Sequence, residues 1–397
     1  MARSRHVRWL EWLPCYVGIF MLVESFGGLA HAGECDFSLV DGAVANMVSN
    51  FSQVPGAGIR IGTSETVLHE TYFGTYDAST VVRTASAAKL LSAATILSVV
   101  DDGLVGLDQP VDSILPEFVG LGSAMTLRQM FSHTSGLPGG VTWPILADDT
   151  ITLAQAVSTI ASTIPLEAPP LTQFSYGGLS MHVGGRMAEV ADGRLWDDLF
   201  AARIANPLGM TATDYEGLGV TDNPRIAGGA RTHLEDYGVF LEMLLRGGMH
   251  GGSRVLSPTA ISEIFADQRG GLPGVVVPDG VGAGGYGLGL WRESFDEFDQ
   301  VIRVSDAGAF GFTPWIEMDR RVYGIIMVDW FRGPLLSTLE GIQALVRQEI
   351  DSCDALGPLP PRVPATGEFS RAVMIATLLL IGLVAPGRAA RSSLPAA

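Results

Sequence analysis

The chain has 397 residues, and 47 % of them are hydrophobic, which is enough to bury the core of one large domain or of two lobes. It carries 42 acidic and 25 basic residues, a formal net charge of −17 at pH 7. Proteins bind nucleic acid chiefly through basic side chains on phosphates, and this acidic sequence contains no basic run. We therefore exclude nucleic acid as a partner.

Residues 1–32 are typical of a secretory signal peptide. Three arginines precede an apolar run over residues 12–23, and Ala30-His31-Ala32 supplies a small-x-small cleavage site. The alternative is a retained membrane anchor, but Glu11 and Glu24 bracket a run that is short for a bilayer. We expect the mature protein to begin near Gly33 and to be exported, to the periplasm or the cell surface.

Cleavage would remove Cys15 and leave Cys35 and Cys353 at the two ends of the folded region. In an oxidising compartment such a pair predicts a disulfide between the first and last helices, while two free buried thiols are the alternative. The sequence has no Cys/His cluster with the spacing of metal ligands, so we expect neither a metal nor another cofactor.

Apolar periodicity predicts elements in the order sheet, helices, sheet. A helix at 37–51 is followed by a strand pair at 57–61 and 66–73, and a largely buried helix runs from Ser86 toward Gly103. The central region is mainly helical. The further predicted helices are 153–164, 180–190, 196–204, 234–245 and 335–350, and the returning strands are 287–291, 301–305, 313–318 and 323–328.

This order indicates a domain over 33–353 with a sheet lobe (33–83 and 280–353) and a helical lobe (84–279), and an active site between them. Residues 354–371 are a Pro-rich linker. The tail at 372–397 has an apolar run and then arginines, which predicts a C-terminal membrane anchor or a processed sorting signal. A terminal helix packed on the domain is the alternative.

Lys89 is the only lysine of the chain, and it follows Ser86 by three residues. If a helix begins near Ser86, the two side chains lie on the same face, one turn apart. An arginine cannot give up its proton in a protein, whereas a buried lysine with a pKa near ~7–8 can take the proton of a neighbouring hydroxyl. The Ser86 N–H, at the positive end of the helix, would stabilise an oxyanion. The spacing can also arise by chance, so the pair alone does not define a site.

Three further stretches resemble the superfamily of serine β-lactamases, penicillin-binding proteins and family VIII esterases, in its class C-like branch. They are residues 82–90 (VRTASAAKL), 107–111 (LDQPV) and 127–138 (LRQMFSHTSGLP). The resemblance covers roughly residues 38–350. It implies an α+β fold of the β-lactamase/transpeptidase type, with an antiparallel sheet flanked by helices and a mainly helical lobe. It also implies that Ser86 is the nucleophile and that His133 is structural.

The second motif of this branch is Tyr-x-Asn, which matches residues 174–178 (FSYGG). The resemblance places Tyr176 beside Ser86 and Lys89, as the group that carries the proton to the leaving group. The alternative is a tyrosine of the core. At the Asn position, which in the family orients the lysine and binds a substrate amide, this chain has Gly178, so both functions are weakened.

The third motif is Lys-Thr-Gly in β-lactamases and His-x-Gly or Trp-x-Gly in esterase-like members, and it matches residues 305–311 (SDAGAFG). The resemblance implies that Gly308 leaves the strand open to substrate and that the Ala309 N–H is the second oxyanion donor. Asp306 departs from the pattern. β-Lactams and peptides ending in D-Ala present a carboxylate to this position, and Asp306 would repel it by about a few kcal/mol. Neutral esters or amides, or substrates that bear an amine, are therefore expected to suit Asp306 better.

These residues support three hypotheses. The first is an esterase or amidase that acts on a small-molecule substrate through an acyl-enzyme on Ser86, with Lys89 and Tyr176 handling the proton, Ser86 and Ala309 holding the oxyanion, and Gly178, Asp306 and Gly308 lining the substrate site. The second is a β-lactamase or D-alanyl-D-alanine carboxypeptidase. The third is a surface binding protein that kept the fold and lost turnover. The sequence does not indicate an oligomeric state.

Overall fold

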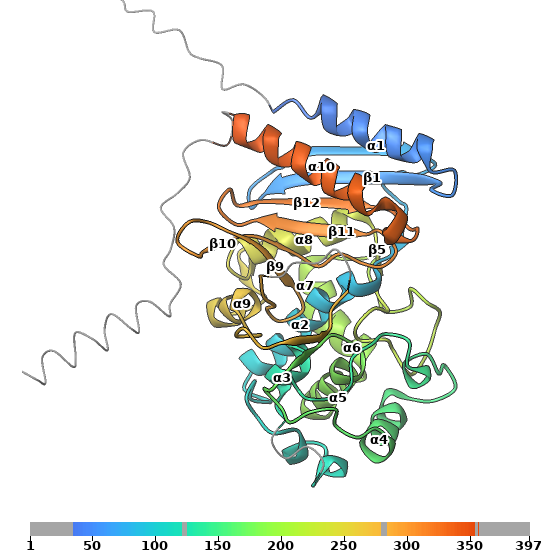
Figure 1. Ribbon diagram of the computed structural model, residues 1–397, viewed down its shortest axis with the longest axis vertical. Helices are drawn as coiled ribbons and strands as arrows, with labels where there is room; N and C mark the ends of the chain where they lie inside the picture. Colours follow the sequence, from blue (N-terminus) through green and yellow to red (C-terminus); the bar gives the residue numbers. More distant parts are fainter. Residues whose placement is uncertain (1–34, 121–124, 279–283, 354–355, 357–397) are drawn as a thin grey trace, which may run out of the picture.

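A six-stranded antiparallel sheet forms one lobe, with the strand order β2-β1-β12-β11-β10-β9 (Figure 1). The computed structural model describes residues 35–120, 125–278, 284–353 and 356. The strands come from the two ends of this region: β1 Gly56–Thr63, β2 Val67–Gly74, β9 Trp291–Phe295, β10 Val301–Ser305, β11 Thr313–Glu317 and β12 Val322–Met327.

Helices cover both faces of this sheet. Helices α1 (Ser38–Asn50) and α10 (Arg332–Ser352) pack side by side on one face, and α8 (Leu234–Leu245) packs on the other (Figure 1). Because both faces are covered, β12 is buried along its whole length and its sequence is almost entirely apolar. The predicted α+β class, an antiparallel sheet flanked by helices with a helical lobe, is confirmed.

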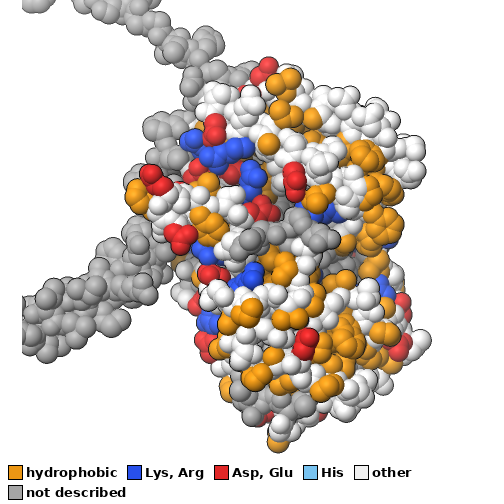
Figure 2. Space-filling model, in the orientation of Figure 1, with side chains coloured by type: hydrophobic (Ala, Val, Ile, Leu, Met, Phe, Trp, Pro, Cys, Tyr) orange, Lys and Arg blue, Asp and Glu red, His pale blue; other side chains and the backbone are white. Residues whose placement is uncertain are grey.

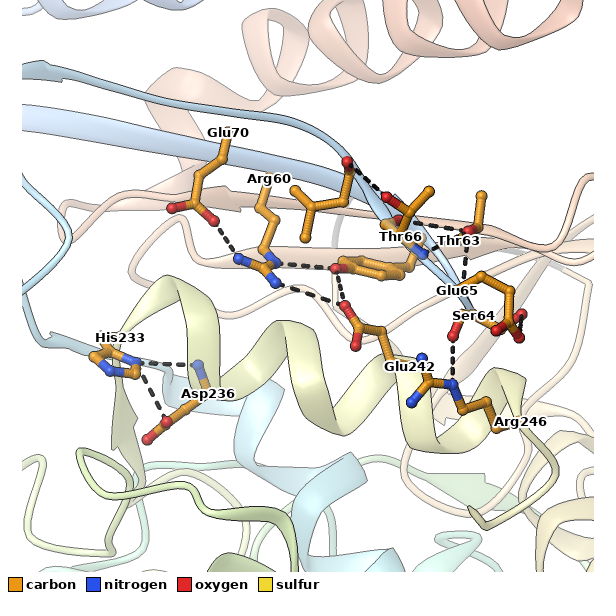
Figure 3. A network of polar contacts seen from close by, with 12 residues as sticks. Arg60, Thr63, Ser64, Glu65, Thr66, Glu70, His233, Asp236, Glu242 and Arg246 are labelled. Carbon is orange, nitrogen blue, oxygen red and sulfur yellow. Dashed lines mark hydrogen bonds and ion pairs between the residues drawn. The ribbon is translucent and has the colours of Figure 1, made fainter. Parts of the chain in front are cut away.

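A buried ionic network holds α8 against the sheet (Figure 3). The Arg60 guanidinium of β1 donates to the Tyr323 hydroxyl of β12 over 3.0 Å and to Glu70 of β2, and it lies 3.5 Å from Glu242 of α8. The Tyr323 hydroxyl donates in turn to Glu242 over 2.8 Å. Because a buried charge is tolerated only when it is paired, this network fixes the position of α8 on the strands.

The second lobe is mainly helical and is inserted between β2 and β9. Its helices are α2 Ala88–Asp101, α3 Leu127–Phe131, α4 Leu153–Thr163, α5 Leu179–Asp192, α6 Trp196–Phe200, α7 Asn206–Leu208 and α9 Pro258–Phe265. Short strand pairs tie its loops together: β3 Val82–Arg83 with β5 Arg231–Thr232, β4 Phe174–Ser175 with β8 Gly274–Val276, and β6 Met249–His250 with β7 Ser253–Arg254.

Most of the predicted elements lie where the periodicity placed them, but the strand predicted at 287–291 is wrong. Residues 287–290 form a turn, and β9 begins only at Trp291. Gly289 has φ +77°, and a Cβ there would lie 2.4 Å from the Lys89 carbonyl oxygen. The glycines of this stretch therefore allow a turn to approach the backbone of α2, which a run of alternating apolar residues does not reveal.

Charged side chains on the sheet lobe are paired. Among the described residues on the face shown in Figure 2, basic side chains lie next to acidic ones over the strands and α10. Arg347 of α10 contacts Glu317 and Asp319, for example, over 2.9 and 2.8 Å. Such interleaved charge contrasts with the clustered basic patch that is typical of nucleic-acid-binding proteins.

The predicted signal peptide at 1–32 and the tail at 372–397 lie outside the described residues, as does the 354–371 linker apart from Leu356. Within the described ranges, none of the helices combines the length and the apolar character needed to span a bilayer.

Cys35 and Cys353 are joined in a disulfide, so the prediction of a bond is confirmed and the alternative of free thiols is wrong. The bond links the start of α1 to the end of α10, two helices that share one apolar cluster with the sheet.

Replacing both cysteines with serine is expected to lower the free energy of unfolding by about 2–5 kcal/mol, because the bond closes a very long loop of the unfolded chain. Thermal unfolding of the wild type with and without reductant measures the effect. The double variant is the control, since reductant should leave it unchanged. An equal melting temperature for the wild type and the double variant would contradict the prediction.

Candidate active site

The nucleophile candidate Ser86 lies in a strained turn at the start of α2. Residues 85–87 form a 3₁₀ turn, and Ala85 has φ +45°, a left-handed conformation that is uncommon for a residue with a Cβ. Thr84 anchors this turn, because its N–H and its hydroxyl both donate to the Ala230 carbonyl over 2.9 Å. Strain of this kind persists only where neighbouring contacts hold it, and it often marks a functional site.

Lys89 is fully buried, and its amine points back at Ser86. The Lys89 Nζ donates to the Ser86 Oγ over 3.1 Å and to the Ala227 carbonyl over 2.6 Å. Burial lowers the pKa of Lys89 to about 8, although the nearby carboxylate of Asp306 opposes this by raising it. A substantial fraction of the amine is therefore neutral near pH 8 and can accept the Ser86 proton.

Tyr176 lies beside the same two groups, in an aromatic cage. Its ring packs against His133, Tyr286 and Trp291, with centroids 4.7, 6.1 and 5.3 Å away. The Lys89 Nζ lies 4.6 Å from the centroid of the Tyr176 ring. Burial raises the pKa of Tyr176, the negative charge of Asp306 adds to this, and a hydrogen bond with Ser86 opposes it. The phenol therefore keeps its proton and can donate it.

His133 supports this cage from behind. It is buried, its Nε2 lies 3.2 Å from the Tyr286 hydroxyl, and burial together with the charge of Lys89 lowers its pKa well below the usual value. A neutral His133 that contacts the Tyr176 ring is a packing element, in keeping with its exclusion from the catalytic set.

Ala309, the second predicted oxyanion donor, lies in a turn that follows β10. The N–H of Gly308 donates to the Phe312 carbonyl and that of Gly311 to the Gly308 carbonyl, which fixes a tight turn around Ala309. A Cβ at position 308 would lie only 2.0 Å from the Thr84 carbonyl oxygen. Gly308 therefore lets the strand approach the residues just before Ser86, whereas the sequence suggested that it keeps a path open for substrate.

Asp306 is placed differently from the expectation that it lines the substrate site. The side chain is only 1 % exposed, and its Oδ2 accepts a hydrogen bond from the Leu90 N–H over 2.9 Å. The carboxyl thus points into the fold, toward the start of α2, and the structure does not bring it to a surface that a substrate carboxylate could reach. The repulsion between Asp306 and a substrate carboxylate that the sequence predicted requires such contact, so this expectation is corrected.

Gly178 also differs from the expectation that it borders the substrate. A Cβ at this position would lie 2.5 Å from Cδ1 of Leu146, a buried side chain of the turn at 144–146. The direction in which an asparagine side chain would leave the backbone is therefore occupied by an apolar group. This corner of the site offers hydrocarbon where the family motif offers an amide.

The carbonyl of Ala227 is a site group that sequence reasoning missed. The segment 226–230 is tied to α2 by two bonds, because Ser92 also donates to the Ile226 carbonyl over 2.6 Å. Thr84, just before the Ser86 turn, donates to the Ala230 carbonyl of the same segment. A backbone acceptor carries no residue-type signal, so only the tertiary structure reveals it.

Among the described residues, no group of three or more potential ligands could hold a metal ion.

The fold, with Ser86, Lys89 and Tyr176 gathered at one buried centre, is that of a serine hydrolase. The chain belongs to the Beta-lactamase family, whose model matches residues 44–327. The structure brings Ser86, Lys89 and Tyr176 together, while the catalytic roles that the resemblance implies for them remain predictions.

Comparisons with individual proteins agree with this family. The chain is 29 % identical to a "Penicillin-binding protein 4" of Amycolatopsis lactamdurans, over 70 % of this chain and 72 % of the relative. It is 24 % identical to a "Lovastatin esterase" of Penicillium rubens, over 62 % of this chain and 78 % of the relative. Among solved structures, a putative β-lactamase from Bacteroides dorei is 31 % identical with a TM-score of 0.71, over 80 % of this chain and 99 % of that one.

Replacing Lys89 with arginine is expected to lower kcat/KM by at least ~10²-fold, because a guanidinium keeps its proton. For the wild type, kcat/KM should rise with pH through about 8, since burial lowers the pKa of Lys89 to about 8 and only the neutral amine accepts the proton. Steady-state ester hydrolysis between pH 5 and 10 measures both. Near wild-type activity of a folded Lys89→Arg variant would refute the role of the base.

Replacing Gly308 with alanine is expected to reduce activity strongly and to destabilise the protein by about 1–3 kcal/mol, because the new Cβ would collide with the Thr84 carbonyl. Gly228→Ala is a matched control beside the same turn, since a Cβ there would lie 3.6 Å from Ala85, an ordinary contact. Denaturant unfolding and ester hydrolysis compare the two variants. Equal behaviour of the two would show that the close approach does not matter.

Proposed function

We propose that the protein is an exported esterase or amidase that forms an acyl-enzyme on Ser86. The observation that carries this proposal is the bond between the Ser86 hydroxyl and the buried Lys89 amine. A lysine with a pKa of about 8, enclosed and next to one hydroxyl, is suited to activate that hydroxyl and to little else.

Each step has a residue in place. Neutral Lys89 takes the proton of Ser86 as the Oγ attacks the substrate carbonyl carbon, and the N–H groups of Ser86 and Ala309 hold the oxyanion. When the tetrahedral intermediate collapses, the Tyr176 phenol donates its proton to the departing oxygen or nitrogen and regains one from Lys89. A water molecule then attacks the acyl-enzyme with the same groups acting in reverse.

Neutral esters or amides fit this site best. The third motif supplies no cation, because Asp306 is acidic and its carboxyl is turned into the fold. Leu146 fills the direction in which the second motif would place an amide group. A substrate carboxylate or a peptide amide therefore lacks the partners that these two motifs would otherwise provide.

Export is supported by the disulfide between Cys35 and Cys353. Disulfides persist in oxidising compartments and are rare in the cytosol. Together with the signal-like residues 1–32 and the apolar tail at 372–397, the bond favours a periplasmic or cell-surface location. Attachment to a membrane through the tail is part of this proposal.

A second candidate is a D-alanyl-D-alanine carboxypeptidase or a β-lactamase. It is favoured by the relative named penicillin-binding protein, which aligns over 70 % of the chain. Such substrates end in a carboxylate. The third motif offers it no cation, because position 306 is an aspartate. We rank this candidate second for that reason.

One set of assays separates the candidates. The purified protein, beside Ser86→Ala, is treated with a fluorophosphonate probe, p-nitrophenyl butyrate, a chromogenic cephalosporin and a peptide ending in D-Ala-D-Ala. We expect labelling and butyrate hydrolysis that are lost in the variant. Turnover of the cephalosporin or the peptide alone would favour the second candidate. Silence of the folded wild type in every assay would contradict the proposal and favour a binding role.

A further inference from the structure

Asp306 is the one residue of the three motifs whose position the proposed mechanism does not explain. Asp306 directly follows β10 and is buried. The family motif has lysine, histidine or tryptophan at this position, whereas this chain has a carboxyl. Burying a carboxylate is costly unless its charge is compensated. The groups around Asp306 must therefore compensate its charge.

The first contact of this carboxyl is with the catalytic helix. The Oδ2 atom of Asp306 accepts from the N–H of Leu90, in the first turn of α2, over 2.9 Å. The N-cap residue of this helix, Ala87, has no side chain that could satisfy such a group. Asp306 thus caps α2 from another element, and its charge lies at the positive end of the helix.

The second interaction is with Lys89, the residue that precedes Leu90. Burial raises the pKa of Asp306 well above the usual value, while the charge of Lys89 and the Leu90 N–H oppose this by stabilising the carboxylate. In return, the carboxylate favours the protonated amine of Lys89. The acid and the amine are therefore coupled within one enclosed site.

The remaining surroundings of Asp306 are apolar or neutral. Its Oδ1 has no hydrogen-bond partner in the described part of the chain, and the carboxyl borders a small cavity lined by Leu90, Leu241, Leu290 and Trp315. The other titratable groups that interact with the pair are uncharged near neutral pH, since burial raises the pKa of each phenol and lowers that of the imidazole: Tyr176, Tyr215, Tyr237, Tyr286 and His133.

We propose that Asp306 is a positioning residue of the Ser86–Lys89 centre, which holds the first turn of α2 through Leu90 and stabilises the protonated amine of Lys89 through its negative charge. The carboxyl touches neither the reacting atoms nor the substrate. It acts by setting the pH above which Lys89 becomes a base. This inference rests on the proposed role of Lys89, but its test does not need turnover.

Because Lys89 is the only lysine, protein grown on ¹³Cε-lysine gives one side-chain signal whose titration reports the protonation of Lys89 directly. We expect a midpoint near pH 8 for the full-length wild type. Asp306→Asn keeps an oxygen for the Leu90 N–H and removes the charge, so its midpoint should fall by about one pH unit or more. The acid limb of kcat/KM should move in the same direction.

Glu293→Gln is the matched control. Glu293 of β9 is another largely buried carboxyl, bonded to Ser305 next to Asp306, and the charges that act on it are Arg303, Arg332 and Glu317 rather than Lys89. Its removal should leave the Lys89 midpoint unchanged. Asp306→Glu, which restores the charge, should return the midpoint toward the wild-type value.

An unchanged or higher midpoint in folded Asp306→Asn, or an equal fall in Glu293→Gln, would overturn the proposal. If Asp306→Asn does not fold, Asp306→Ser, which also removes the charge, is titrated instead, and its midpoint should likewise fall below that of the wild type. A midpoint near 8 that falls in Asp306→Asn while no substrate is hydrolysed would uphold this inference and refute the proposed function.

Discussion

The structure depends on the burial of a single amine. Lys89 can serve as a base only while water is kept from its ammonium, because hydration would restore an ordinary lysine pKa. Around it, the Ala227 carbonyl and the Ser86 hydroxyl accept its hydrogens, and the aromatic ring of Tyr176 lies across it. Each of these neighbours comes from a different segment of the chain. These segments of the helical lobe must therefore be folded together before the lysine acquires its chemistry.

The sheet lobe contributes to this site through backbone shape more than through side chains. Gly308 allows the turn that follows β10 to lie against Thr84, two residues before Ser86. The rest of the lobe holds this edge still. Arg60 and Glu242 join the strands to α8, and the Cys35–Cys353 bond closes the layer formed by α1 and α10. Rigidity at the edge matters because an oxyanion donor that is misplaced by an ångström loses most of its effect.

The sequence predicted the identity of the central groups better than their surroundings. Ser86, Lys89 and Tyr176 carry residue-type signals at fixed spacing, and the hairpin of β1 and β2 follows from alternating apolar residues. The disulfide followed from counting cysteines. By contrast, the direction of the Asp306 carboxyl, the Ala227 acceptor and the turn at Gly289 depend on contacts between segments distant in the chain. A pattern in one segment has no information on what another segment places against it.

The two positions that depart from the family motifs argue against a decayed site. A decayed site is expected to lack specific contacts at its altered positions, because nothing selects for them. At Gly178 the missing side chain is matched by Leu146, which packs into the space an asparagine would need. At Asp306 the altered residue binds the N–H of Leu90 and acts on Lys89. Each departure is thus accommodated by a specific neighbour, while Ser86, Lys89 and Tyr176, to which the proposal gives the proton transfers, are all present. A change in substrate preference accounts for this combination more simply than a loss of catalysis.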